Sequence, residues 1–356
     1  MKLKKLFLLV MAGILVLSSL VGCTTDKNKE ETRTIVDITG AEVEVSVKVE
    51  KIINLNPFGC QIMLGLGLKD YLVGISRDTF ETKWLEEVCP EAKNISQYSD
   101  ETAAETLLAA NADLVLSQDP DVAEDLRSKG VPCITFGYLT LDDYKFNIKL
   151  LGDILGGDAK VKTDLYLDYL DGKIADVNSA LSGKITEKET MHYVNANGDK
   201  GFYKTSGKDS TTDYCAQLCS IDLSAAALID FPESKVDAEA LLATNPDNVI
   251  IGGRYQHVIY DELFSADEWK NISAIKNGNV FKIPMGFASW DRYSLETALL
   301  IPWMASTIYH EYYEFDAVNE VINFYKTFMG YELTETQAEY MIAGLTPNGE
   351  KEIASR

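Results

Sequence analysis

Residues 105–116, ETLLAANADLVL, decide the fold of this chain because they occur a second time as residues 239–250, EALLATNPDNVI. Seven of the twelve positions are identical, and the copies lie 134 residues apart. Each copy predicts a short apolar helix, a tight polar turn and a β-rich run, which is half of a βαβ unit. The spacing is too long for a solenoid repeat and suits two similar lobes with a ligand cleft between them. The alternative is that the motif is only a common way to enter a buried parallel strand.

The N-terminus has the pattern of a secretory signal. Three lysines within the first five residues precede an apolar run over residues 6–20, which is short for a membrane span. The string LVGC then ends at Cys23 and resembles a bacterial lipobox, whose cysteine is lipidated. We therefore expect residues 1–22 to be a lipoprotein signal peptide, Cys23 to carry the lipid, and residues 23–33 to be a flexible tether. An ordinary signal peptide or an uncleaved anchor is the alternative.

The charge of the chain limits its partners. The formal net charge is −22, and it becomes −25 when the three lysines of the signal are removed. The chain has no long basic run, which argues against nucleic acid and against an anionic membrane surface as partners. We expect membrane contact only through the lipid anchor.

Cysteine and histidine usage argues against a metal site built by the protein itself. Five cysteines follow Cys23 without a CxxC pair, and the three histidines are widely separated. Cys215 and Cys219 are four residues apart on a predicted helix and would share one face of it. We interpret them as core cysteines, with a metal or redox pair as the alternative.

The order of strands and helices predicts the domain organisation. Residues 34–157 contain a hairpin followed by alternating strands and helices, which is typical of a parallel α/β lobe. Residues 158–183 have apolar positions at helical spacing and predict a connector helix of about 37 Å. Residues 184–356 resume the alternation. We predict an α/β fold with two Rossmann-like lobes, each with a parallel sheet, joined by one long α-helix. A long surface helix within one domain is the alternative.

Further stretches make the mature chain resemble a known family. TIVDITGAEV from Thr34 is similar to its opening hairpin, and KIINLN from Lys51, with GLGL from Gly65, is similar to its first strand and helix. The first repeat resembles its E-x-LL-x-x-x-PDLV segment, and WKNISAIKNGNVFKIP from Trp269 resembles a segment near its C-terminal end. The chain thus resembles the helical-backbone (class III) periplasmic substrate-binding lipoproteins of ABC importers, which serve ferric siderophores, haem and vitamin B12. It departs from the family at Ala112, where proline is usual, and in the loop WDRY from Trp290.

The resemblance implies a monomeric extracytoplasmic solute-binding lipoprotein that delivers its ligand to a permease dimer with its ATPase. It implies a ligand held between lobes that open and close only modestly. It also implies that one acidic residue on each lobe docks against arginines of the permease, and by position these are Glu105 and Glu239. The alternative for each is a glutamate favoured by the dipole of its helix N-terminus, and the two interpretations are compatible.

Candidate ligand-binding residues follow the predicted strands, because ligands of open parallel sheets bind at the carboxyl ends of the strands. Three of the six arginines of the chain fall in these loops, which predicts a local positive pocket. Aromatic side chains beside them would cover the apolar faces of an organic ligand. The candidates are Phe58, Arg77, Tyr138, Lys204, Arg254, Tyr255, Trp290, Arg292 and Tyr293. We predict an anionic metal chelate, most simply a ferric siderophore, and no cofactor beyond the metal that the ligand carries.

Other ligands and functions remain as alternatives. Molybdate or tungstate would use the arginines but needs few aromatics. Haem could be ligated by Tyr138, Tyr255, Tyr293 or His257, although the sequence shows no committed axial pair, and a corrinoid stays open. The chain contains no GxSxG, HExxH, P-loop or GxGxxG string, so we do not expect an enzyme. An adhesion or sensor lipoprotein without transport is the remaining alternative.

Overall fold

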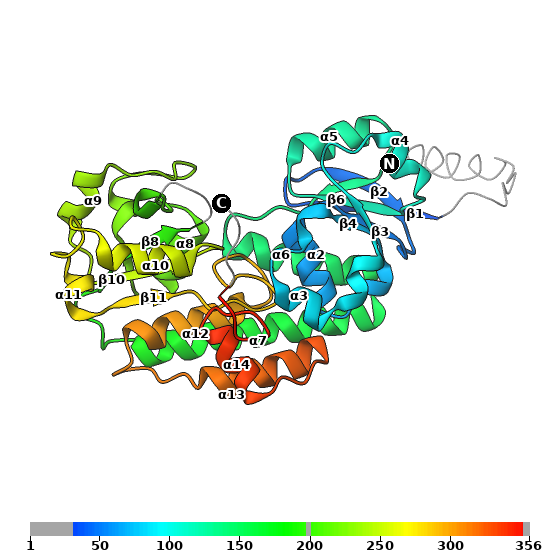
Figure 1. Cartoon of the computed structure of the whole chain (residues 1–356). Coiled ribbons are helices and arrows are strands. Elements are labelled where there is room, and N and C mark those ends of the chain that lie inside the picture. Colours follow the sequence, from blue (N-terminus) through cyan, green and yellow to red (C-terminus); the bar gives the residue numbers. More distant parts are fainter. Residues whose placement is uncertain (1–30, 197–200, 352–356) are drawn as a thin grey trace, which may run out of the picture.

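A computed structural model describes residues 31–196 and 201–351, which form two α/β lobes side by side (Figure 1). The chain enters through a hairpin in which β1 (Thr32–Val36) pairs antiparallel with β2 (Glu42–Ser46). The expected end of the tether at residue 33 is therefore wrong. The guanidinium group of Arg33 donates to the carbonyl oxygens of Asp153 (3.4 Å) and Ile154, near the C-terminal end of a helix. These contacts fix the backbone that a tether would leave free.

The N-terminal lobe is built on a five-stranded parallel sheet with strand order β5-β4-β3-β6-β7. The strands β3 (Ile52–Asn54), β4 (Leu72–Ser76), β6 (Leu114–Ser117) and β7 (Cys133–Thr135) match predicted strands. The edge strand β5 (Ser96–Tyr98) was not predicted, because its sequence SQY is polar and short. The helices of this lobe are α2 (Pro57–Gly65), α3 (Lys83–Val88), α4 (Ala104–Ala109), α5 (Pro120–Ser128) and α6 (Leu141–Leu155).

The C-terminal lobe has a four-stranded parallel sheet with strand order β11-β10-β8-β9. The strands are β8 (Thr190–Asn195), β9 (Asp222–Leu223), β10 (Asn248–Gly252) and β11 (Val280–Lys282), and β10 is buried along its whole length. The helices are α8 (Thr211–Leu218), α9 (Ala238–Thr244), α10 (Gln256–Ser265) and α11 (Ser273–Asn277). Parallel sheets in both lobes confirm the predicted fold class.

The repeated sequence occupies equivalent places in the two lobes. The first copy forms α4 and leads into β6, and the second forms α9 and leads into β10. Asn111 and Asn245, at the same position of the two copies, both adopt left-handed backbone, with φ of 51° and 47°. Asparagine tolerates this conformation at the end of a helix better than most residues. The shared asparagine is therefore explained by the turn between helix and strand.

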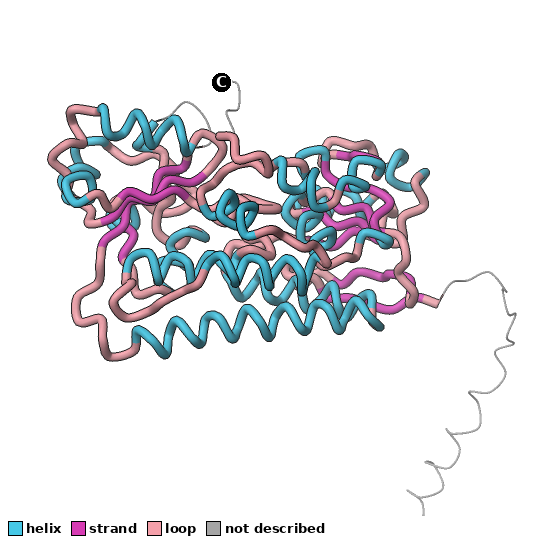
Figure 2. The backbone as a smooth tube through the Cα atoms, turned by 60° about the horizontal axis from the view of Figure 1, so that its bottom comes forward, coloured by secondary structure: helices cyan, strands magenta, loops and turns pink. Residues whose placement is uncertain are grey.

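A helical layer joins the lobes. The 25-residue helix α7 (Gly157–Leu181) runs along both of them and packs against α6 and α12 (Figures 1 and 2). The C-terminal helices α12 (Thr297–Ile308), α13 (Ala317–Phe324) and α14 (Glu335–Ile342) complete the layer (Figure 1). One continuous apolar core includes residues of both lobes and of this layer, which favours small relative motion of the lobes. In the described ranges, no helix combines the length and apolar character needed to cross a bilayer.

Candidate functional site

Residues of both lobes line a cavity of about 700 Å³, a size suited to a small organic ligand. Its lining combines hydroxyl groups, aromatic rings and a few charged side chains from both lobes. The N-terminal lobe contributes Ile38, Thr39, Asn56, Phe58, Gln118, Pro120, Thr135, Gly137, Tyr138, Leu139 and Asp143. The C-terminal lobe contributes Tyr193, Asn195, Thr205, Ser206, Ser210, Thr211, Thr212, Phe231, Pro232, Glu233, Ser234, Asp291, Arg292 and Tyr293.

The carboxyl ends of the strands place the lining residues. Asn56 follows β3, Gln118 follows β6, and Thr135 and Asn195 end β7 and β8. The Asn56 side chain connects the end of β7 to the start of α2. Its amide group donates to the Phe136 carbonyl at 2.7 Å, and its oxygen caps α2. The cavity therefore lies where the strand-end rule for parallel sheets puts a ligand.

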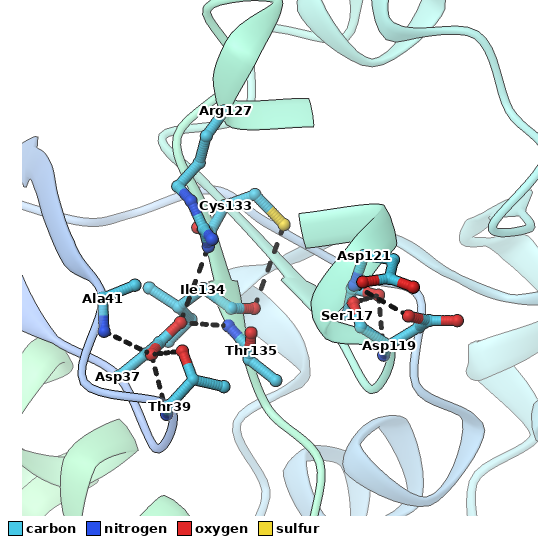
Figure 3. A network of polar contacts seen from close by, with 10 residues as sticks. All are labelled: Asp37, Thr39, Ala41, Ser117, Asp119, Asp121, Arg127, Cys133, Ile134 and Thr135. Carbon is cyan, nitrogen blue, oxygen red and sulfur yellow. Dashed lines mark hydrogen bonds and ion pairs between the residues drawn. The ribbon is translucent and has the colours of Figure 1, made fainter. Parts of the chain in front are cut away.

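A buried carboxylate, Asp37, supports the N-terminal rim of the cavity (Figure 3). One oxygen accepts hydrogen bonds from the amides of Thr39 and Ala41 and from the Thr39 hydroxyl, and the other accepts from the Thr135 amide at 2.9 Å. Arg127 lies 3.6 Å from that second oxygen. Burial alone would raise the pKa of Asp37, but the hydrogen bonds hold it below its ordinary value. The charged carboxylate of Asp37 thus holds Thr39 and Thr135 in position at the cavity.

Tyrosines connect the cavity to the shared core. The Tyr138 hydroxyl donates to the Tyr293 carbonyl at 2.9 Å across the lobes. The Tyr293 ring stacks on Tyr144 with centroids 5.3 Å apart, and the Tyr144 hydroxyl reaches the Ser294 carbonyl at 2.7 Å. Burial raises the pKa of both Tyr138 and Tyr293, so their phenols are neutral. The buried Tyr293 hydroxyl has no hydrogen-bond partner in the structure, which makes it available to a ligand.

Among the described residues that line the cavity, Arg292 is the only lysine or arginine. Its guanidinium carbon lies 5.9 Å from the centre of the Phe58 ring, on the opposite lobe, and its Nε lies 4.0 Å from Asp291 Oδ1. Burial would lower the pKa of Arg292, but Asp291, Tyr193 and Glu81 raise it above its ordinary value. The arginine therefore remains charged at the interface of the lobes.

The C-terminal lobe also contributes a wall that is rich in hydroxyl groups. Ser210 caps α8 by accepting from the Asp213 amide at 3.2 Å, and Thr212 donates to Ser206 at 3.2 Å. The Thr205 hydroxyl donates to the Tyr193 carbonyl at 2.6 Å. This wall offers hydrogen-bonding groups without a net charge of its own.

The structure places four of the nine candidate ligand-binding residues, Phe58, Tyr138, Arg292 and Tyr293, in the lining of one cavity. Five lie outside that lining. Arg77 and Arg254 are exposed, Lys204 and Tyr255 are half-buried, and Trp290 is fully buried in the apolar core. Trp290 does not line this cavity and belongs to the apolar core instead. The expected group of three arginines is therefore reduced to Arg292 in this cavity.

Several lining residues were not among the candidates. Tyr193 and Asn195 obey the strand-end rule, because they lie at the end of β8, so the rule could have identified them. Asp291 also lines the cavity, next to the candidate Arg292. Residues 231–234 come from a long segment between η5 (Ser224–Ala227) and α9, and only the folded chain brings them to the cleft.

The five cysteines of the described residues and two of the histidines, His192 and His257, lie in the interior, whereas His310 is exposed. Cys60, Cys89, Cys133, Cys215 and Cys219 are free and buried. Burial raises the pKa of the Cys215 thiol to about 12, as befits a core side chain. His257 lies outside the cavity lining and contacts the Gly344 carbonyl at 2.7 Å. Within the described ranges, no three His, Cys, Asp or Glu side chains are grouped so as to hold a metal ion.

The predicted docking glutamates lie in the first turns of the repeated helices. Glu105 is in α4 and Glu239 is in α9, and both are exposed. Cys23, the predicted lipidation site, lies outside the described residues.

A model of the periplasmic binding protein family matches residues 22–285. The chain belongs to this family. It is 22% identical over 258 residues, 70% of this chain and 77% of the relative, to the uncharacterized ABC transporter substrate-binding lipoprotein YvrC of Bacillus subtilis (strain 168). It is 27% identical over 241 residues, 64% and 72% of the two chains, to the iron(3+)-hydroxamate-binding protein FhuD of the same organism.

A solved structure shares the fold. The molybdate-binding protein MolA of Haemophilus influenzae, with molybdate bound, superimposes with a TM-score of 0.72 at 20% identity. The match covers 85% of this chain and 99% of that protein. Together with the family match, this likeness confirms the predicted helical-backbone binding-protein fold.

Proposed function

We propose that this member of the family is the extracytoplasmic substrate-binding lipoprotein of an ABC importer, and that it captures a metal chelate, most simply a ferric siderophore, between its lobes. The interlobe cavity of about 700 Å³ carries the proposal. Its size and its rings, among them Phe58, Tyr138 and Tyr293, suit an organic ligand that brings its own metal.

The charges of the lining refine the predicted anionic ligand. Arg292 offers a planar fork to an acidic or oxygen-rich group of the chelate. Asp143, Glu233 and Asp291 also line the cavity, and they oppose a ligand with a large negative charge. We therefore propose a chelate that presents one such group to Arg292 and is otherwise weakly charged. The iron–hydroxamate specificity in the name of one relative supports this class.

The alternative ligands differ in how well they suit the cavity. A molybdate or tungstate ion is favoured by the molybdate bound to a structural relative, but it would leave most of this cavity and its rings without contact. For haem, Tyr293 has a buried, unpartnered hydroxyl in the lining, whereas Tyr255 and His257 lie outside it. A corrinoid is the remaining ligand alternative, and a sensor without transport is the remaining functional one.

The proposed partners follow from the family and from the position of two glutamates. Glu105 and Glu239 present one exposed carboxylate on each lobe to arginines of a permease dimer that works with an ATPase. Lipidation of Cys23 would hold the protein at the outer face of the cell membrane as a monomer. A lipoprotein relative supports this anchoring.

Fluorescence titration with a ligand panel tests the proposal. The panel contains ferric tris-acetohydroxamate, a ferric catecholate, haemin, cobalamin and molybdate. We expect saturable binding of a ferric chelate, a loss of at least about tenfold in Arg292→Ala, and little change in Arg77→Ala, which removes an exposed arginine outside the cavity. Binding of haemin, cobalamin or molybdate alone would replace the siderophore assignment. Native mass spectrometry of the protein purified from its host would then identify the bound ligand by mass.

A further inference from the structure

Glu81 is a carboxylate of the N-terminal lobe that lies outside the cavity lining but within electrostatic range of it. It follows η2 (Arg77–Thr79), its side chain is half-buried, and its Oε2 is buried without a hydrogen-bond partner in the structure. The charged groups that act on it are Arg292, Asp291 and Arg254, all from the C-terminal lobe. A buried carboxylate oxygen without a donor is unfavourable, so Glu81 Oε2 does not stabilise the fold.

The next residue fixes Glu81 against the other lobe. The Thr82 hydroxyl donates to the Gly286 carbonyl at 2.8 Å and is also 3.1 Å from the Phe287 carbonyl. Thr82 is buried and caps α3 through the Leu85 amide. Glu81 is therefore held at the contact between the lobes by its own neighbour rather than lying on a free loop.

Arg292, like Glu81, has a buried polar atom without a hydrogen-bond partner. Its Nε is buried without a hydrogen-bond partner, and its ion pair with Asp291 spans 4.0 Å, the outer limit of such a contact. Asp291 is already engaged, because the hydroxyls of Tyr193 and Ser289 donate to its two oxygens. Glu81, which has an oxygen without a donor, forms no ion pair within 4.0 Å of Arg292 in the described residues, so the two side chains act on each other only through their charges.

We propose that Glu81 is a built-in counter-ion that competes with the acidic group of the incoming ligand for Arg292, so that protonation of Glu81 makes Arg292 available. The role of Arg292 as ligand contact rests on the proposed function, whereas its competition with Glu81 does not. Glu81 acts as a positioning residue, since it works through Arg292 and lies outside the lining. Burial raises the pKa of Glu81, Asp291 adds to this effect, and Arg292 and Arg254 oppose it.

The direction of the pH effect follows from the charges. Ionised Glu81 weakens the field of Arg292 at the cavity, and protonated Glu81 does not. An anion at Arg292 should therefore bind more tightly as the pH falls through the raised pKa of Glu81. Binding of the anion should in turn favour uptake of a proton by Glu81, because the linkage is reciprocal.

Sulfate at constant ionic strength is the probe, because it reports the availability of Arg292 without the natural ligand. Its dissociation constant would be measured from thermal shifts between pH 4 and pH 8. We expect Glu81→Gln to bind sulfate at least about fivefold more tightly than the wild type at pH 7, with a smaller pH dependence than the wild type. Glu81→Gln combined with Arg292→Gln should lose this gain. Glu311→Gln removes an exposed carboxylate of equal charge and should behave like the wild type.

Equal sulfate affinity in the wild type and Glu81→Gln across this pH range would overturn the proposal, and so would a gain that survives loss of Arg292. If Glu81→Gln does not fold, Glu81→Ala, which also removes the carboxylate, is measured in its place. The sulfate affinity of the wild type must rise as the pH falls, and this rise must be smaller in Glu81→Ala. Failure of every ferric chelate to bind the wild type would instead count against the proposed function and leave the sulfate result standing.

Discussion

Asp113 and Asp247 occupy the same position of the two repeated segments and make the same kind of contact. Asp113 Oδ2 accepts from the amides of Glu50 and Lys51 at 2.7 and 2.8 Å, at the entry to β3. Asp247 Oδ2 accepts from the amide and the hydroxyl of Thr190 at 3.0 and 2.6 Å, where β8 begins. Each aspartate therefore fastens the neighbouring strand of its own sheet. The repeat is a folding device present once in each lobe.

Replacing either aspartate with alanine should destabilise the protein. We expect Asp113→Ala and Asp247→Ala each to lower the free energy of unfolding by about 1–3 kcal/mol, since each leaves strand-entry donors without their acceptor. The double variant should show the sum, because the contacts lie in different lobes. Urea unfolding measures all three values. A double variant no weaker than one single variant would contradict two independent anchors.

Asp37 should give stability that depends on pH. Its pKa is below the ordinary value in the folded protein, so its contribution is present above the ordinary pKa of aspartate and is lost as the pH falls through the folded value. Asp37→Asn should cost about 1.5–3 kcal/mol at pH 7. The difference from the wild type should shrink below about pH 4 in urea unfolding. A constant difference down to pH 3 would show that the carboxylate charge is not what matters.

Gly252 should be intolerant of a side chain because it lies against Asp291. A Cβ atom there would lie 2.1 Å from Asp291 Oδ2 and 2.8 Å from the Tyr193 hydroxyl. Gly252→Ala should therefore displace Asp291, cost about 1–3 kcal/mol and change chelate affinity. Gly172, within α7, has nothing within 4 Å of such an atom, and Gly172→Ala should stabilise by about 0.5–1 kcal/mol. Equal effects of the two substitutions in thermal unfolding would refute the close contact.

Reversing the charge of Glu105 and Glu239 should separate docking from ligand capture. Both side chains are exposed and outside the cavity lining, so Glu105→Lys and Glu239→Lys should leave chelate affinity unchanged. Uptake of the labelled chelate by cells should fall by about tenfold or more in the double variant, because like charges would face each other at the permease. Glu311→Lys serves as the matched surface control. Normal uptake by the double variant would remove these glutamates from the docking contact.

The local sequence was enough to predict most elements of the fold. The apolar periodicity of residues 158–183 indicated α7, and the repeat indicated one helix and strand in each lobe. The local sequence did not predict the polar edge strand β5, because an edge strand need not carry an apolar pattern. It also ended the tether too late, since Arg33 takes its partners from α6, more than a hundred residues away.

The candidate site was predicted less completely than the fold. The strand-end rule located Phe58, Tyr138, Arg292 and Tyr293, because chain direction in a parallel sheet fixes which edge receives the loops. It could not tell that Trp290, two residues before Arg292, turns into the core. Whether a loop side chain faces the cleft or the interior depends on packing against the other lobe, which local sequence does not record.

The sequence by itself determined the two parallel lobes and the long helix between them, since these follow from periodicity and from a repeat whose Asn and Asp act on backbone close to them in the fold. Only the tertiary structure decided the charge of the cleft. It left Arg292 in the lining without Arg77 and Arg254, and it put Glu81 of the N-terminal lobe close enough for the charges of Glu81 and Arg292 to affect each other. Electrostatic interactions depend on distance and burial across the lobes, and both are set when the chain is packed.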